Sequence, residues 1–198
     1  MAGCAYTLAE TAIGPVGFVW SERGIAGLQL PESGADATRA RTRRRFPDAA
    51  EATPPASVRE VIGDVLALLA GEPRDLSSTS LDLAGAPPFN IRVYEVALTI
   101  GHGETSTYGT VAARIGEPGA ARAVGAALGQ NPIPIIVPCH RVLAAGGRPG
   151  GFSAPGGALT KLRLLAIEGA APGGQPDLFA RARAVIPGLA TREPGTHG

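Results

Sequence analysis

The chain has 198 residues, 44% of them hydrophobic, which allows one large domain or two small ones around a packed core. Its net charge of +1 argues against a protein that coats nucleic acid in bulk. Two cysteines cannot build a disulfide framework, and neither a signal peptide nor a membrane-length apolar run is visible, so we expect a soluble, cytoplasmic protein without membrane contact.

The first part of the chain predicts a small sheet. Phe18–Trp20 and Ile25–Leu30 are typical of two strands, and Ser21–Gly24 supplies the turn between them. Residues 36–45 contain five arginines, a run that favours a solvated helix. A surface that touches phosphate is the sharper alternative for the same run.

A second helix is predicted to begin at Ser57, with apolar residues at helical spacing and Gly71 placed to stop it. Leu81–Leu83 is a candidate for a further short strand. Pro87 and Pro88 then mark a boundary. We therefore predict a structural α+β domain over residues 1–86, a second domain over 87–170, and a Pro/Gly/Ala-rich tail over 171–198.

The second domain starts with helical signals. Residues 89–100 predict a helix with one apolar face. A short helix over 109–115, a tight turn at 116–119 and a further helix over 120–128 form the pattern of a helix-turn-helix. A plain αα-hairpin is the alternative that the pattern alone leaves open.

The last of these helices carries mostly small side chains. A row of alanines lets a backbone or groove approach closely, and a surface of this kind suits a narrow groove better than a row of long side chains that read bases. Arg122 is the one charged residue on it. The small residues that we assign to a DNA-facing surface are Ala121, Ala123, Ala126 and Ala127.

Charge is distributed unevenly along the chain. No Asp or Glu occurs between Glu117 and Glu168, although that window holds several arginines and a lysine. Such a window lets a polyanion approach without repulsion. A Gly/Ala-rich core segment that merely lacks charge would give the same pattern.

Cys139 and His140 stand in the most informative segment, Pro138–Val142. The preceding apolar run, 133–137, predicts a short buried strand. A thiol becomes a nucleophile where a base or a positive field favours its thiolate. In an extended segment neighbouring side chains point to opposite faces, so we expect a water relay between thiol and imidazole rather than direct contact.

With Asn131-Pro132 upstream and Gly151-Phe152-Ser153 and Glu168-Gly169 downstream, this segment resembles the active-site region of the O6-alkylguanine-DNA alkyltransferases. These are the suicide repair proteins also called methylated-DNA–protein-cysteine methyltransferases. The resemblance covers roughly residues 89–170. It implies an α+β fold, a small sheet-plus-helix module followed by a mostly helical, winged helix-turn-helix-like domain.

The resemblance also implies catalytic roles. Cys139 would accept the alkyl group irreversibly, through a relay of thiol, water, His140 and Glu168. Tyr108 would donate a proton to guanine N3 as the leaving group gains charge. Taken alone, the histidine, the glutamate and the tyrosine could each be structural.

Further roles follow from the same resemblance. Ser153 would point at O6 of the flipped base, and the carbonyl of Val142 would accept from its exocyclic amine. Asn131 would tie the helix-turn-helix to the active-site segment, and Arg122 would fill the gap left in the duplex. Phe152, at the pocket wall, stands where many members have tyrosine.

The predicted function is therefore DNA repair, in which O6-alkylguanine is flipped out of duplex DNA and dealkylated once per protein molecule. We expect a monomer that needs no cofactor. We expect no metal either, because the first domain has one cysteine and no histidine. Alternatives are a lesion-binding relative without transfer, a helix-turn-helix regulator and a thiol hydrolase.

Overall fold

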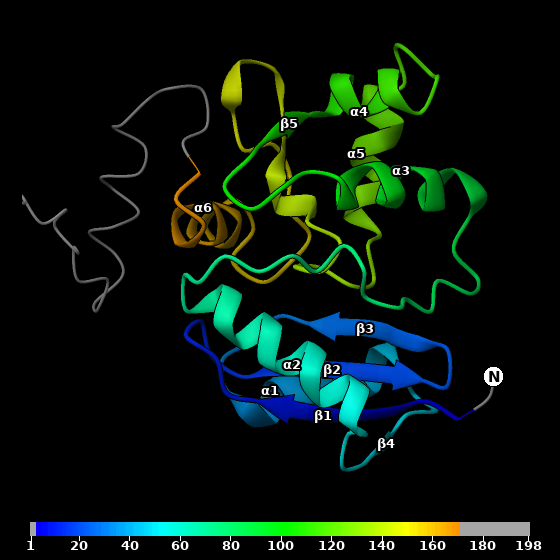
Figure 1. The fold of residues 1–198 in the computed structure, drawn as a ribbon, viewed down its shortest axis with the longest axis vertical. Coiled ribbons are helices and arrows are strands. Elements are labelled where there is room, and N and C mark those ends of the chain that lie inside the picture. The colour runs from blue at the N-terminus through cyan, green and yellow to red at the C-terminus, as the bar shows by residue number, and fades with distance from the viewer. Residues whose placement is uncertain (1–2, 171–198) are drawn as a thin grey trace, which may run out of the picture.

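A computed structural model describes residues 3–170 of the chain. The predicted tail, 171–198, lies outside the described residues. We call residues 3–86 the N-terminal module and residues 88–170 the C-terminal module. In Figure 1 the sheet occupies the lower half and the later helices the upper half. The predicted α+β class, a sheet module followed by a mostly helical one, is confirmed.

The N-terminal module contains a four-stranded sheet in the order β3-β2-β1-β4. Antiparallel pairing joins β1 to β2 and β2 to β3, whereas β4 pairs with β1 in parallel. The predicted hairpin is therefore present. The bounds are β1 (Ala5–Ala9), β2 (Val16–Ser21), β3 (Gly24–Gln29) and β4 (Ala50–Glu51).

Two helices cover this sheet. The predicted arginine-rich helix is α1 (Ala35–Arg45), and α2 (Ala56–Leu69) crosses the front of the sheet in Figure 1. Leu81 makes only an isolated bridge to Ile25, so the further strand predicted over Leu81–Leu83 is reduced to one pair.

The C-terminal module holds the helix-turn-helix, formed by α4 (Tyr108–Arg114) and α5 (Ala121–Gly129). Before them comes α3 (Pro88–Leu98), and α6 (Ala158–Ile167) closes the described chain. Short elements complete it: β5 (Ser106–Thr107), β6 (Val142–Leu143), and two 3-10 helices, η1 (Cys139–Arg141) and η2 (Ala145–Gly147).

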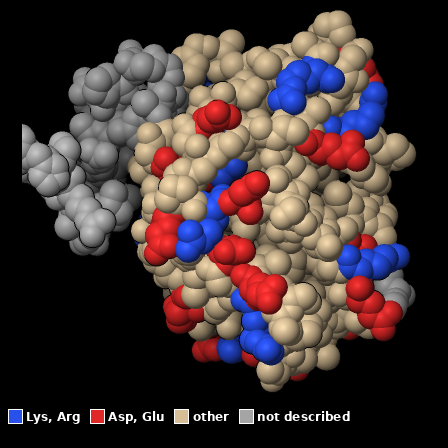
Figure 2. Space-filling view, in the orientation of Figure 1, with Lys and Arg blue, Asp and Glu red and all other residues tan. Residues whose placement is uncertain are grey.

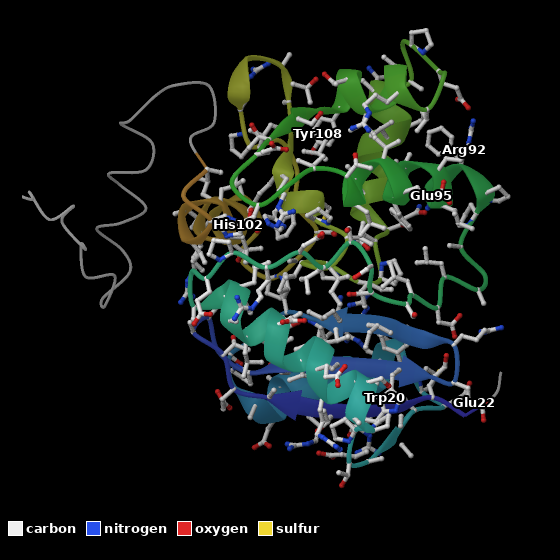
Figure 3. All side chains as sticks on the ribbon, in the orientation of Figure 1. Trp20, Glu22, Arg92, Glu95, His102 and Tyr108 are labelled. Carbon is white, nitrogen blue, oxygen red and sulfur yellow. The ribbon has the colours of Figure 1, made fainter. Side chains whose placement is uncertain are left out.

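The main apolar core continues from one module into the other, and a small second cluster lies within the C-terminal module. It includes Trp20 from the sheet, which Figure 3 labels, and Val124 from α5. The backbone N–H of Leu28 in β3 donates to the carbonyl of Pro132, 2.9 Å away, just before the active-site segment. The sheet thus supports that segment directly. The domain boundaries predicted at 86/87 and 170/171 stay a prediction.

The surface shown in Figure 2 carries acidic and basic side chains intermixed, without a broad patch of one sign. No helix among residues 3–170 combines the length and the hydropathy that a bilayer crossing demands.

Candidate active site

The segment before Cys139 is a buried turn, not the predicted strand. Residues 133–137 close a turn in which the Val137 N–H donates to the Ile133 carbonyl at 3.0 Å, and Ile135 has φ of 77°. The prediction was wrong because the run of apolar side chains signals burial but not backbone conformation. Prolines at 132, 134 and 138 also lack the N–H groups that a strand ladder needs.

Asn131 holds this turn together. Its Nδ2 donates to the Val137 carbonyl at 2.9 Å, and its Oδ1 accepts from the Ile133 N–H at 3.0 Å. The asparagine is buried, so these bonds satisfy backbone groups that would otherwise be unpaired inside the protein. This geometry supports the architectural part of the role expected of Asn131.

Cys139 begins a 3-10 helix rather than continuing an extended segment, which corrects that expectation. Successive side chains in such a helix still diverge by about 120°. Burial raises the pKa of the Cys139 thiol, and the Asn131 amide, the Lys161 ammonium and nearby backbone N–H groups oppose that rise. The resting sulfur therefore needs a base to become a thiolate.

His140, the base that the resemblance implies, has a buried partner. The Nε2 atom of His140 lies 2.9 Å from Oε1 of Glu168, and both side chains are inaccessible to solvent. Arg141 completes the cluster: its Nε and Nη2 donate to the two carboxylate oxygens of Glu168, and its Nη1 donates to the Ile100 carbonyl. His140, Arg141 and Glu168 are hereafter the charge cluster.

The charge cluster assigns the tautomer of His140. Desolvation would raise the pKa of the Glu168 carboxyl, but its hydrogen bonds to His140 and Arg141 outweigh that effect and hold the pKa at about 2. Burial lowers the pKa of His140, so the imidazole is neutral near pH 7. An ionised carboxylate only accepts, so Nε2 carries the proton and Nδ1 keeps its lone pair. Among residues 3–170, Nδ1 has no hydrogen-bond partner.

Tyr108 reaches the site through the short parallel pair of β5 and β6. Ser106 pairs with Val142, three residues after the cysteine. The Thr107 hydroxyl then caps α4 by accepting from the Thr110 N–H at 3.1 Å, which makes Tyr108 the first helical residue. Burial raises the pKa of the Tyr108 hydroxyl, and the nearby Cys139 adds to the rise. Figure 3 shows Tyr108 inside the upper module.

Lys161 is a site residue that the sequence analysis missed. Its side chain is fully buried, its Nζ donates to the Val142 carbonyl at 2.6 Å, and it lies 3.4 Å from the Tyr108 hydroxyl. Burial lowers its pKa to about 8. Its seven-residue spacing from Glu168, which caps the C-terminus of α6, was the available signal, since two helical turns bring both side chains to one face. Because Lys161 Nζ donates to the Val142 carbonyl, that carbonyl already has one hydrogen-bond donor.

A cavity of about 480 Å³ opens beside the thiol. Six of the predicted residues line it: Tyr108, Ala121, Arg122, Cys139, Phe152 and Ser153. The charge cluster and Asn131 are buried and do not line it. The Ser153 hydroxyl donates to the Gly129 carbonyl at 2.8 Å, which fastens the loop after Gly151 to the end of α5. We call this space the base cavity.

The alanines of α5 divide into two sets. Ala123 and Ala126 are exposed, as is Arg122, and Ala121 is half-buried at the rim of the base cavity. Ala127 is 2% exposed and packs in the core, and its carbonyl accepts from the Tyr94 hydroxyl. A DNA-facing surface on α5 therefore depends on the other three alanines and Arg122.

Comparison with known proteins gives consistent matches. The family profile described as "6-O-methylguanine DNA methyltransferase, DNA binding domain" matches residues 88–170. The methylated-DNA–protein-cysteine methyltransferase of Mycobacterium leprae is 48% identical over 109 residues, 55% of this chain and 64% of that protein. The chain thus spans just under two thirds of that relative.

Longer matches come from Mycobacterium tuberculosis. Its methylated-DNA–protein-cysteine methyltransferase is 38% identical over 163 residues, which are 82% of this chain and 91% of the relative. The crystal structure of M. tuberculosis OGT in complex with DNA superposes with a TM-score of 0.68 at 36% identity, covering 83% of this chain and 92% of that one.

Proposed function

The chain belongs to the methylated-DNA–protein-cysteine methyltransferase family, and from this premise we propose that it repairs DNA by moving an alkyl group from guanine O6 to Cys139. One observation carries the assignment of the residue. Cys139 lines a cavity together with Tyr108, and the charge cluster begins at the next residue, His140. Cys4, the other cysteine, lines a different cavity, which contains neither Tyr108 nor any member of the charge cluster.

Transfer begins with loss of the thiol proton. The free lone pair on Nδ1 of His140 takes that proton through a bridging water, and Glu168 stabilises the imidazolium that forms. Arg141 keeps the carboxylate ionised and oriented by its two hydrogen bonds. Lys161 adds a positive charge that favours the thiolate.

The sulfur then attacks the alkyl carbon attached to O6. The S–C bond forms as the C–O6 bond breaks, and the electron pair of that bond passes to the purine. Tyr108 donates its proton at N3, so guanine leaves as a neutral base. Lys161, 3.4 Å from the tyrosine hydroxyl, stabilises the phenolate that remains.

Duplex DNA is the partner that this reaction needs, with O6-alkylguanine as the lesion. Flipping a base out of the stack costs a few kcal/mol, and a residue inserted in its place offsets part of that cost. Arg122 is exposed at the rim of the base cavity, and the small residues beside it allow close approach of the duplex. We assign Arg122 to this insertion, with binding that is largely independent of sequence.

A thioether at Cys139 is chemically stable, so each molecule acts once. We propose a monomer, because every side chain that the mechanism uses comes from one chain. A catalytic thiol that must remain reduced fits a cytoplasmic location.

Intact-protein mass spectrometry tests the proposal. Incubation with a duplex containing O6-methylguanine should add one methyl group per molecule, mapped to Cys139. Cys139→Ser should show no adduct, whereas the matched control Cys4→Ser should react like the wild type.

The remaining outcomes separate the alternatives. Binding without an adduct would indicate a lesion-binding protein, and binding that ignores the lesion would indicate a regulator. Repeated turnover would indicate a hydrolase. Each of these results would overturn the proposed transfer.

A further inference from the structure

Cys139 is reached from a second side. A cavity of about 220 Å³ lies between the active-site segment and the N-terminal module, and Cys139, Phe152 and Ser153 line both it and the base cavity. Its far wall consists of β3 and α1. The loop residues Ala154 and Pro155 line it as well. We call it the arginine cavity, because Arg41 and Arg45 line it.

Two guanidinium groups line the arginine cavity, those of Arg41 and Arg45, and no Asp or Glu does. Arg45 Nη1 donates to two neutral oxygens, the Leu28 carbonyl at 3.2 Å and Oε1 of Gln29 at 3.0 Å. Gln29 is 3% exposed and its Nε2 is held by the Leu30 carbonyl at 2.8 Å, so its Oε1 has to face the arginine.

This pair of cations has little compensating charge. Within residues 3–170, no carboxylate lies at ion-pair distance from Arg45, and Arg41 has only Glu32, 3.8 Å from its Nε. Burial lowers the pKa of Arg45, and repulsion from Arg41 adds to the shift. Two neighbouring guanidinium groups on one cavity wall form a site suited to a carboxylate, which their planar fork can bind with two hydrogen bonds.

We propose that the arginine cavity receives the distal end of the O6 substituent and makes the protein selective for carboxylate-terminated alkyl groups. This inference rests on the proposed function. In the displacement the sulfur of Cys139, the attacked carbon and O6 lie in one line, so the rest of a longer substituent points sideways from that line and lies beside the sulfur. The arginine cavity adjoins the base cavity at that residue. Since about 10–15 Å³ holds a water molecule, its volume admits a chain of several carbons.

The transfer step is the one already described. Sulfur displaces the guanine O6 from the first carbon of the carboxyalkyl group, guanine leaves with the proton from Tyr108, and a carboxyalkyl thioether remains on Cys139. The carboxylate itself takes no part in bond making. It orients the substituent by pairing with Arg41 and Arg45.

Single-turnover rates on three matched pairs of duplexes test the inference. The acids are O6-carboxymethyl-, O6-(3-carboxypropyl)- and O6-(5-carboxypentyl)guanine, and each has its neutral carboxamide as partner. O6-methylguanine reports the basal reaction. We expect the acid to react about tenfold faster than its amide for at least one tether, as charge-assisted pairing would give.

Variants locate the selectivity. Arg41→Gln with Arg45→Gln should bring the acid-to-amide ratio to about one, with the methyl rate unchanged. Arg44→Gln, on the same helix but not lining the cavity, is the matched control and should keep the ratio. Arg45 also donates to the Leu28 carbonyl, so the double variant could fail to fold. In that case Arg41→Gln alone provides the test, and its acid-to-amide rate ratio should fall about threefold.

The failures are distinguishable. Equal rates for acid and amide at all three tethers, with normal methyl transfer, would overturn the arginine-cavity proposal alone. A double variant that slows acids and amides alike would also overturn it, because the arginines would then act without regard to charge. Absence of methyl transfer by the wild type would overturn the proposed function and this inference together.

Discussion

The two modules differ in what they bury. In the N-terminal module the buried polar residues are all neutral: Gln29, Thr38 and Thr42. The C-terminal module buries four side chains of the charged residue types within 29 positions of one another: His140, Arg141, Lys161 and Glu168. Both modules share one apolar core, so the contrast lies in the charges and not in the packing.

Burying charge costs stability unless each group is paired, and replacing such groups by apolar ones is often neutral or stabilising. A fold has no thermodynamic need for these four groups. Their position near Cys139 explains them, since perturbed pKa values are characteristic of sites that move protons. The N-terminal module acts as a support, whereas the C-terminal module contains buried charged groups that lower its stability and serve the reaction.

Removing the shared carboxylate should break this contrast most severely. Glu168→Gln leaves the Arg141 guanidinium buried with half of its pairing lost, and deprives His140 of its partner. We expect a loss of about 3–5 kcal/mol in unfolding free energy, measured by urea denaturation. Glu51→Gln, which breaks the exposed pair with Arg39 in the N-terminal module, is the control and should cost under about 1 kcal/mol. Equal losses would refute the contrast.

The pH dependence of the unfolding free energy tests the contribution of the Glu168 carboxylate more closely. The Glu168 pKa is lowered from 4.5 to about 2, so the folded state binds this proton more weakly than the unfolded chain. Its contribution, on the order of 3 kcal/mol, is therefore fully present above pH 4.5 and is lost as the pH falls through 2. The lowered pKa of His140 acts in the same direction from pH 6.5 downward.

The difference in unfolding free energy between wild type and Glu168→Gln should accordingly stay constant above pH 4.5 and shrink toward pH 2. A difference that persists unchanged at pH 2 would show that the carboxylate charge is not what stabilises the charge cluster.

How far the sequence predicts this arrangement depends on the kind of signal. The β2–β3 hairpin and the two helices α4 and α5 follow from periodicity and turn residues, which act locally, but the same pattern leaves open whether the helices form a helix-turn-helix or a plain αα-hairpin. The pairing of His140 with Glu168 follows from the family resemblance. The turn over 133–137 could not be predicted from the sequence. Hydrophobicity indicates burial only, and the backbone conformation is fixed by side-chain hydrogen bonds of Asn131 that no local pattern encodes.

The sequence does not predict the burial of Lys161 or the arginine cavity, for a different reason. A lysine on a helix is normally solvated, and this one is buried where α6 brings it against Val142 and the Tyr108 side chain. Arg41 and Arg45 are read from sequence as part of a solvated run, with a phosphate-touching surface as the alternative. Their place on a cavity wall with Cys139 depends on how the two modules pack, which is a property of the tertiary fold.

Tyr108→Phe separates chemistry from stability within the C-terminal module. The hydroxyl has only long contacts, 3.4 Å to both Lys161 Nζ and the Gly151 carbonyl, so its removal should change the unfolding free energy little. Loss of the proposed general acid should slow methyl transfer about 100-fold, seen in single-turnover kinetics. A variant that transfers at the wild-type rate would remove Tyr108 from the mechanism.

The smallest expected effect comes from a glycine beside that tyrosine. Gly150 has φ of +67°, and a Cβ there would stand 2.8 Å from the Tyr108 hydroxyl oxygen. Gly146 has a similar φ of +75°, but a Cβ at that position would meet no atom within 4 Å beyond its chain neighbours. Both alanine variants should therefore lose about 1 kcal/mol of stability from the same backbone strain.

Only Gly150→Ala should also slow methyl transfer, by about tenfold, because it displaces the proton donor. Unfolding free energies and single-turnover rates of the two variants, taken together, decide the matter. If Gly146→Ala slows transfer as much, the loss belongs to the loop as a whole, and the placement of Tyr108 is not what the glycine protects. If neither variant slows it, the tyrosine has more freedom in the base cavity than its packing implies.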